Sequence, residues 1–311
     1  MTGGRYFLGI DGGQSSTTAL IGDESGRVIG YGRGGPCNHV SGPEARTKFM
    51  NAVGGCVRSA AIRAGIANLN FAASCAGFSG GAEDKAFLLD EMFIADKKLV
   101  THDALIALSG ATGGEPGVMV ISGTGSIAFG RNAAGKTMRA GGWGYVFGDE
   151  GGGYSIAREA MRAALRMEEG WGPVTSLRLM LLGFTGSKDA NELLHRLYTQ
   201  EFSRPQMAAY SKLVDAEAMA GDEVAQTILD QAAGHLAGYA RAVRDTLFGA
   251  DSKVPVRQVG GVFKSARLRA AFASRIESES PRYLPAAGAL LEAYRLANWH
   301  VMLSEVPGFD K

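Results

Sequence analysis

Two glycine-rich loops contain the residues of this chain that are best suited to bind phosphate. The first runs from Asp11 to Thr18 (DGGQSSTT) after the apolar segment YFLGI, and the second runs from Ser122 to Ser126 (SGTGS) after VMVI. In both places a second apolar segment, a polar turn and a third segment follow. Glycine has no Cβ, so the backbone N–H groups of such loops are open to phosphate oxygens. Two equivalent loops about 110 residues apart predict duplicated domains that face each other and hold a chain of phosphates, such as that of ATP.

Two carboxylates lie at the ends of predicted strands. A buried acid such as Asp11 is costly unless it is paired or near a cation, and beside a phosphate loop we expect it to hold Mg²⁺ through water. A plain β-turn with a polar strand end is the alternative. Asp103 follows the predicted strand 98–101 and could take the proton of a hydroxyl that attacks the γ-phosphate of ATP. The simpler interpretation is that Asp103 is the N-cap of the helix predicted from Ala104, and the two roles are compatible. We expect His102 to be a packed neighbour rather than a base.

The segment from residue 141 to 151 (GGWGYVFGDEG) combines glycines with an aromatic ring and two acids. Trp143, placed between glycines, is suited to stacking on the face of a sugar. Asp149 and Glu150 could accept hydrogen bonds from sugar hydroxyls. The alternative is a structural aromatic residue followed by the acidic N-terminus of a helix.

Two other segments give weaker indications. Gly260 and Gly261 follow a predicted strand and precede Lys264, so an adenine or ribose could approach the backbone there. Asn38 and His39 follow a proline-containing loop and could reach the cleft between the two domains, although a turn explains them equally well. The loop from Ser122 to Ser126 contains no G-x-G-x-x-G, and no helix is predicted directly after it, which argues against a dinucleotide fingerprint.

Hydrophobic periodicity predicts the elements that must position these residues. After the first three strands, apolar residues recur every four positions from 43 to 64, which indicates a helix. A buried strand over 68–78, a helix over 83–92, the strand 98–101 and a helix over 104–111 follow. The pattern begins again at residue 117 and continues into a long helical stretch, a helix over 222–248, a strand over 256–259 and helices over 266–276 and 285–297. This order predicts an α/β fold with mixed sheets flanked by helices.

Composition limits the classes of partner. The chain has 311 residues, 46% of them hydrophobic, with 32 Lys plus Arg against 31 Asp plus Glu. This length suits two domains, and the balanced charge gives no reason to expect nucleic acid or a membrane surface as a partner. The N-terminus does not resemble a signal peptide, and no apolar run is long enough to span a membrane.

The cysteines indicate the compartment. Cys37, Cys56 and Cys75 form an odd, sparse set without a C-x-x-C pair, so we expect a cytoplasmic protein with no structural zinc.

Taken together, these motifs resemble the sugar kinase, heat-shock ATPase and actin superfamily. Within it the chain is most similar to the N-acetylglucosamine and glucosamine kinase branch of the BadF/BadG/BcrA/BcrD-type ATPase family. The resemblance covers essentially the whole length. It is carried by GIDGGQSST, PCNH, THDALIAL, ISGTGSIAFGRN, GGWGYVFGDEGGGYSIA, VGGVFKS and PAAGALLEA, in this order.

The resemblance implies two RNase-H-like (actin/hexokinase-like) domains around an ATP cleft. Residues 1–116, completed by a C-terminal helix at about 285–311, would form the first domain, and residues 117–284 the second, with a helical insertion. The implied reaction is transfer of the γ-phosphate of ATP, with Mg²⁺, to the 6-hydroxyl of an amino sugar or hexose. Relatives are often homodimers.

Matched motif by motif, the resemblance also assigns roles to residues. The catalytic base is Asp103, which also contacts the sugar, and Asp11 orients the metal. Phosphate would bind Gly12, Gly13, Gln14, Ser15, Ser16 and Thr17, and also Ser122, Gly123, Thr124 and Gly125. Adenosine would bind Gly260, Gly261 and Lys264, and the sugar would bind Asn38, Gly142, Trp143 and Asp149. Animal members have Asn directly after the SGTGS loop, where this chain has Ile127, so the resemblance does not fix which sugar is used.

Two other classes of function are weighed against a kinase. An ATPase activator of a benzoyl-CoA-reductase-type system would share the ATP cleft, but it needs cysteines that hold an iron–sulfur cluster between subunits, and the three cysteines here suggest no such site. A non-catalytic sensor of sugar and nucleotide would not need Asp11 and Asp103.

Overall fold

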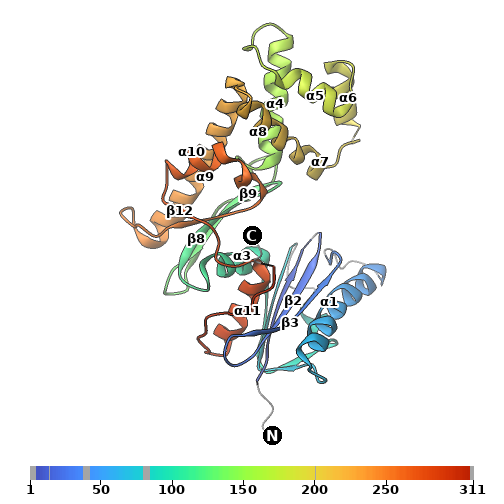
Figure 1. Ribbon diagram of the computed structural model, residues 1–311, viewed down its shortest axis with the longest axis vertical. Helices are drawn as coiled ribbons and strands as arrows, with labels where there is room; N and C mark the ends of the chain where they lie inside the picture. The colour runs from blue at the N-terminus through green and yellow to red at the C-terminus, as the bar shows by residue number, and fades with distance from the viewer. Residues whose placement is uncertain (1–4, 14, 38–42, 80–84, 200, 309–311) are drawn as a thin grey trace. The chain divides into compact units, whose positions relative to one another are not determined.

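The computed structural model describes residues 5–13, 15–37, 43–79, 85–199 and 201–308. The chain divides into two units, each with its own sheet (Figure 1). The first unit comprises Met1–Pro116 and Pro281–Lys311, and the second comprises Gly117–Ser280.

The sheet of the first unit has the strand order β3-β2-β1-β5-β7. Its strands are β1 (Phe7–Gly12), β2 (Thr17–Gly22), β3 (Val28–Gly34), β5 (Ala73–Phe78) and β7 (Lys98–His102). Strands β1, β2 and β3 pair antiparallel, whereas β5 is parallel to both β1 and β7. The register aligns Gly12 with Phe78, and Phe78 with His102. The residues that follow these three parallel strands therefore meet at one edge of the sheet.

Helices cover both faces of this sheet (Figure 1). Helix α1 (Pro43–Ala64) buries Phe49, Val53, Val57 and Ala61 against one face, as the four-residue periodicity predicts. On the other face lie α3 (Asp103–Thr112) and α11 (Pro285–Leu296), which pack against each other and form a separate apolar cluster with Phe7 and Leu20. The last helix thus completes the first unit. The remaining elements are the short helix α2 (Ala86–Asp90) and a two-stranded sheet of β4 (Asn70–Phe71) and β6 (Ile94–Ala95).

The second unit repeats the same sheet topology, with the order β10-β9-β8-β11-β12. Its strands are β8 (Gly117–Ser122), β9 (Ser126–Arg131), β10 (Thr137–Gly141), β11 (Val256–Val259) and β12 (Ser278–Glu279). Again the first three pair antiparallel, and β11 is parallel to β8 and β12. The predicted α/β fold with two RNase-H-like sheets is therefore confirmed.

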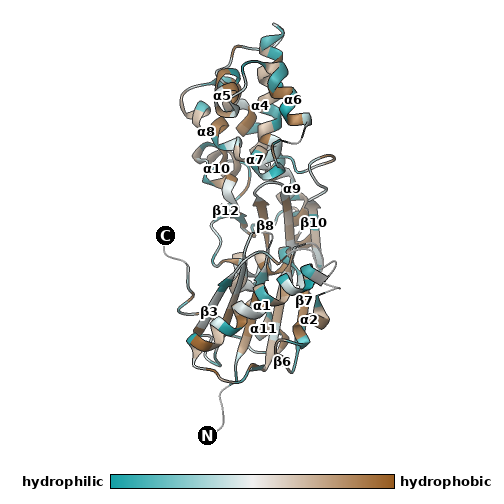
Figure 2. Cartoon of the chain, turned by 90° about the vertical axis from the view of Figure 1, so that its right-hand side faces the viewer, coloured by the Kyte–Doolittle hydropathy of each residue, from teal (hydrophilic) through white to brown (hydrophobic). Residues whose placement is uncertain are grey.

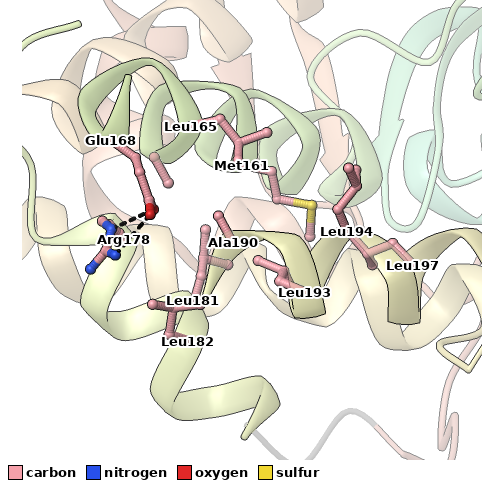
Figure 3. A pocket seen from close by; sticks show the side chains of 11 residues that line it. Met161, Leu165, Glu168, Arg178, Leu181, Leu182, Ala190, Leu193, Leu194 and Leu197 are labelled. Carbon is pink, nitrogen blue, oxygen red and sulfur yellow. Dashed lines mark hydrogen bonds and ion pairs between the residues drawn. The ribbon is translucent and has the colours of Figure 1, made fainter. Parts of the chain in front are cut away.

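Between β10 and α9 (Glu223–Phe248) the second unit contains a run of helices. Its helices are α4 (Gly153–Glu168), α5 (Leu177–Thr185), α6 (Ala190–Tyr198), α7 (Arg204–Ala209) and α8 (Ser211–Met219). Apolar side chains of α4, α5 and α6 point toward one another (Figure 3). The helices alternate polar and apolar residues along their surfaces (Figure 2), as expected of helices that bury one face.

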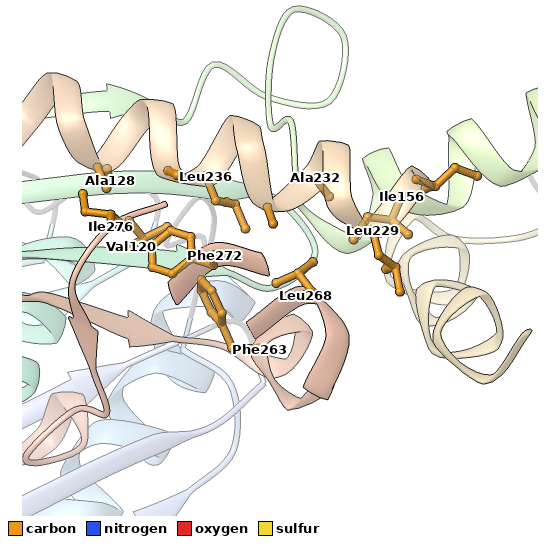
Figure 4. Packing of buried hydrophobic residues seen from close by; sticks show 14 of the residues in the cluster. Val120, Ala128, Ile156, Leu229, Ala232, Leu236, Phe263, Leu268, Phe272 and Ile276 are labelled. Atoms are coloured by element: carbon orange, nitrogen blue, oxygen red, sulfur yellow. The ribbon is translucent and has the colours of Figure 1, made fainter. Parts of the chain in front are cut away.

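The long helix α9 joins these helices to the sheet. Its side chains form one core with the strands and with η1 (Gly261–Lys264) and α10 (Ala266–Ala273) (Figure 4). Asp222 accepts a hydrogen bond from the N–H of Ala225 and so caps this helix. None of the helices in the described ranges is long and apolar enough to cross a membrane.

Three predicted elements differ from the structure. The strand expected over 68–78 is two strands, because residues 70–71 pair with β6 and only residues 73–78 join the main sheet. Helix α10 ends at Ala273, three residues earlier than expected, and the described part of the helix expected over 83–92 is α2 (Ala86–Asp90). In each case apolar residues next to the element pack into a hydrophobic core. Hydrophobic periodicity alone cannot tell these residues from a continuation of the helix or strand.

Candidate active site

Three strand ends in the first unit bring two carboxylates and a serine together. Asp11 is the penultimate residue of β1, Ser79 follows β5 and Asp103 follows β7. The Ser79 hydroxyl donates to Oδ2 of Asp103 at 2.7 Å, and the Ser79 N–H donates to the Gly12 carbonyl at 3.1 Å. Ser79 therefore ties the candidate base to the first phosphate loop. Sequence reasoning did not assign it a role, although the run GFSGG at a strand end was a usable signal.

The electrostatics of this edge suit a cation. Burial raises the pKa of Asp11 from 3.8 to about 6, and the nearby negative charge of Asp103 contributes to the rise. A bound cation would relieve both effects. The described residues contain no cluster of three or more His, Cys, Asp or Glu side chains that could hold a metal by themselves. Mg²⁺ usually keeps several waters and binds one or two carboxylates together with substrate phosphates, and Asp11 could supply one such carboxylate.

The helix that carries Asp103 is capped by its neighbour. His102 is the N-cap of α3, and its Nδ1 accepts a hydrogen bond from the N–H of Leu105 at 3.2 Å. The alternative role of Asp103 as that cap is therefore wrong, and so is the expectation that His102 is merely packed. Asp103 is the first residue of the helix and is exposed, and the partial positive charge of a helix N-terminus favours its carboxylate.

The first glycine-rich loop, which is predicted to bind phosphate, is a tight turn. The Gly13 N–H donates to the Ser16 carbonyl at 2.9 Å, and Ser15 and Ser16 are exposed. Thr17 is buried, and its hydroxyl donates to the Gly35 carbonyl at 2.8 Å, so its side chain supports the loop from behind. Gln14, which was also predicted to bind phosphate, lies outside the described residues.

The second glycine-rich loop, which is also predicted to bind phosphate, is braced by the segment that follows β10. The hydroxyls of Ser122 and Ser126 donate to the carbonyls of Gly151 and Glu150, both at 2.7 Å. The backbone N–H groups that open α4 donate to the carbonyls of residues 123 and 124, at 2.7 and 3.0 Å. The loop therefore has a fixed backbone before any ligand binds.

Asp149, a predicted sugar ligand, lies directly against this loop. It is only 4% exposed and has a positive φ of 62°, which is unusual for a residue with a side chain. A Cβ added to Gly125 would be 2.4 Å from Oδ2 of Asp149, so only glycine fits there. Nη2 of Arg204 lies 3.5 Å from the same oxygen. The structure thus brings a predicted sugar-binding carboxylate and a predicted phosphate loop into contact.

The candidate adenosine residues adjoin the same loop. A Cβ on Gly260 would be 2.2 Å from the Ser122 carbonyl oxygen, and Gly260 has a φ of +109°. Gly261 and Lys264 are exposed at the two ends of η1.

The remaining predicted sugar residues lie near the end of β10. Trp143 is 66% exposed, and the guanidinium of Arg139 lies 4.7 Å from the centre of its ring. Gly142 has a φ of +70° and packs on Ile127. Glu150 is held by the hydroxyl of Tyr239; desolvation works against ionisation, but this hydrogen bond keeps the pKa of Glu150 below its usual value. Asn38 lies outside the described residues. Tyr239 had no sequence signal, because it comes from the middle of α9.

Comparison with known proteins gives consistent results. The model of the BadF/BadG/BcrA/BcrD ATPase family matches residues 8–293. An N-acetylmuramic acid/N-acetylglucosamine kinase of Clostridium acetobutylicum is 33% identical over 271 residues, which are 84% of this chain and 86% of that protein. An N-acetyl-D-glucosamine kinase of Dictyostelium discoideum is 30% identical over 284 residues, 83% of this chain and 85% of that protein.

A solved structure agrees with these relatives. The crystal structure of a candidate N-acetylglucosamine kinase from Chromobacterium violaceum superposes with a TM-score of 0.73 at 27% identity. The match covers 94% of this chain and 99% of that one.

Proposed function

The chain belongs to the BadF/BadG/BcrA/BcrD ATPase family, and we propose that it is an ATP-dependent kinase that phosphorylates the 6-hydroxyl of an amino sugar, N-acetylglucosamine or glucosamine. One observation carries the proposal: an exposed carboxylate, Asp103, is hydrogen-bonded through Ser79 to a phosphate-type loop that begins with a second acid, Asp11. Related amino-sugar kinases, similar over more than four fifths of the chain, support this class of acceptor.

In the proposed reaction Asp103 acts as the general base. It accepts the proton of the sugar hydroxyl as the oxygen forms a bond to the γ-phosphorus, while the bond to the oxygen that bridges to the β-phosphate breaks and ADP leaves. Asp11 orients Mg²⁺, which supplies positive charge to the phosphates when it is bound. The exposed Ser15 and Ser16 and the braced Ser122–Gly125 backbone donate hydrogen bonds to phosphate oxygens.

The second unit would recognise the ligands. Asp149 would accept hydrogen bonds from sugar hydroxyls, and the exposed ring of Trp143 would cover one sugar face. The close approach of Gly260 to Ser122 leaves Gly261 and Lys264 beside the phosphate loop, where adenosine would lie. By the same family resemblance we propose a homodimer, which the mass of the protein in solution would test.

The direct test is ADP release from Mg·ATP across a panel of hexoses and amino sugars. General-base catalysis is worth on the order of 10²–10⁴-fold, so Asp103→Asn should lower kcat by about that factor while ATP binding is retained. Asp96→Asn removes another exposed carboxylate of the first unit and serves as the matched control. ADP release that ignores every sugar, or full turnover by Asp103→Asn, would overturn the proposal.

The ATPase-activator alternative is not favoured by the structure. A cluster shared between subunits needs cysteines at the surface, whereas Cys37, Cys56 and Cys75 are all buried.

A further inference from the structure

A groove of about 790 Å³ opens in the second unit between α4, α6, α7 and the loop that follows β10. We propose that this groove binds an acidic substituent, a carboxylate, carried by the amino-sugar acceptor. The inference rests on the proposed kinase function and names a class of acceptor for it. The residues that define the groove here are Tyr145, Tyr154, Arg158, Arg162, Tyr198 and Arg204.

The groove begins at the candidate sugar site. Arg204, at the start of α7, contacts the carboxylate of Asp149, and its guanidinium lies 5.2 Å from the ring centre of Tyr145. Tyr145 is two residues beyond Trp143 in the loop predicted to cover the sugar. A substituent that leaves the sugar on the side of Asp149 would therefore enter the groove beside Arg204.

The charges of the groove favour an anion. Its described lining contains three guanidinium groups and no carboxylate. Two acids lie next to them: Glu159 is 2.7 Å from Nη1 of Arg162 and 3.8 Å from Nε of Arg158, while Asp149 is 3.5 Å from Arg204. The three cations therefore exceed the two anions that face them.

Two of these arginines have donors left for a ligand. Nη1 of Arg158 donates to the Tyr145 carbonyl at 3.0 Å and its Nε is buried, so a ligand would reach this guanidinium through the exposed part of the side chain, which is 31% exposed. Within the part of the chain that the structure describes, Arg204 makes one long polar contact, to Asp149, and its side chain is 44% exposed. A guanidinium carries five N–H donors in a planar fork that matches a carboxylate, so these two side chains are suited to grip one.

The size and aromatic lining indicate more than a free anion. The volume falls in the range of about 300–1,000 Å³ that is usual for small-molecule sites. Tyr145 and Tyr154 pack edge to face with ring centres 5.1 Å apart, and Tyr198 is 80% exposed at the other side. Such rings can cover the carbon skeleton of a substituent while the arginines bind its acid group.

A second, smaller pocket lies next to the groove and differs from it in volume and in lining. The smaller pocket shares four apolar lining residues with the groove: Met161, Leu165, Leu194 and Leu197. The ion pair between Glu168 and Arg178 lies at its end (Figure 3). It holds only about 30 Å³ and is lined almost entirely by carbon, so it has room for little more than a water molecule. We regard it as a packing defect, whereas the groove is large, open and cationic.

The experiment compares three acceptors in the ADP-release assay: N-acetylglucosamine, N-acetylmuramic acid, which carries an ether-linked lactic acid, and the uncharged amide of that acid. The readout is the ratio of kcat/KM for the acid to kcat/KM for the amide. A hydrogen-bonded ion pair predicts a ratio of about 10 to 100 for the unmodified protein. Arg204→Gln and Arg158→Gln should each reduce this ratio, and together they should bring it close to one. Arg269→Gln, an exposed arginine of α10 outside the groove, should leave it unchanged.

The outcomes separate the two proposals. If N-acetylglucosamine is phosphorylated but the ratio is near one, or is the same in the double arginine variant, the groove proposal is wrong and the kinase proposal stands. If no sugar supports turnover, the kinase proposal fails, and calorimetric titration of the acid and of the amide then tests the groove directly. Equal binding of the two, or binding that survives both arginine substitutions, would refute it.

Discussion

Replacing Asp11 by asparagine should stabilise the first unit while it removes activity. In the folded protein, burial and the charge of Asp103 raise the pKa of Asp11 from 3.8 to about 6. The folded state therefore binds a proton more tightly than the unfolded state, and stability falls as the pH rises from about 4 through about 6. Above that range Asp11 is ionised in both states, and its cost to the folded protein is constant.

The size of this cost follows from the pKa. At about 1.4 kcal/mol per pH unit, a rise from 3.8 to about 6 corresponds to about 3 kcal/mol near pH 8. Near pH 4 most of the difference disappears, and the same linkage leaves only about 0.5 kcal/mol. Because asparagine has nearly the same shape and no charge, Asp11→Asn should recover up to these amounts of folding free energy.

Asp23 provides a control of opposite sign in the same unit. Desolvation opposes its ionisation, but hydrogen bonds from Ser25 and Arg27 hold the pKa of Asp23 below its usual value. Asp23→Asn should therefore destabilise the protein near neutral pH.

The assay is urea unfolding at a series of pH values, without nucleotide and then with Mg·ATP. We expect Asp11→Asn to unfold at a higher urea concentration near pH 8, with an advantage that shrinks toward pH 4. Mg·ATP should stabilise the unmodified protein by mass action and should have a much smaller effect on the variant. A variant that is less stable than the unmodified protein at high pH, or whose advantage does not depend on pH, would refute the assignment of Asp11 as a desolvated cation ligand.

Two other substitutions test the loops. Gly125→Ala places a methyl group 2.4 Å from the carboxylate of Asp149, so kcat/KM should fall by about 100-fold or more. In the control Gly123→Ala the added methyl group meets nothing within 4 Å, and kcat/KM should fall by less than about 10-fold. Equal losses in the two variants would contradict the packing argument. Ser79→Ala should lower kcat about 10-fold with unchanged ATP affinity because it frees the side chain of Asp103, and Ser79→Thr should restore activity. If Ser79→Ala changes KM or folding stability instead of kcat, its role is structural.

Much of the fold could be predicted because its signals are local. An apolar strand, a glycine loop and a second strand recur in both halves, and both copies became the central strands of sheets with the same order. The helix over 43–64 and the strand over 256–259 match their predicted bounds, since long periodic runs leave little ambiguity. The end of the predicted strand over 98–101 placed Asp103 at the correct sheet edge.

The missed residues depend on contacts between distant segments. Ser79 is an ordinary serine after a strand until the register of β1, β5 and β7 brings it to Asp103. The groove is assembled from three helices and a loop, and its arginines have no common motif. Arg158 and Arg162 are four residues apart on α4 and look like a solvated helix face, while Arg204 begins another helix. Hydrophobic periodicity cannot detect such a surface, because it reports only which face of each helix is buried.

The duplicated loops also differ in a way that separates their chemistry. The residue directly before the first glycine of the loop is Asp11 in the first unit and Ser122 in the second. Ser122 is fully buried, and its hydroxyl donates to the Gly151 carbonyl at 2.7 Å. An ionised carboxylate has no proton to donate, so an acid there would face that carbonyl oxygen with no compensating hydrogen bond. The second loop must therefore stay uncharged, which suits a cradle for anionic phosphates. Of the two loops, the first therefore carries the costly ionised acid, and there we propose that the cation binds.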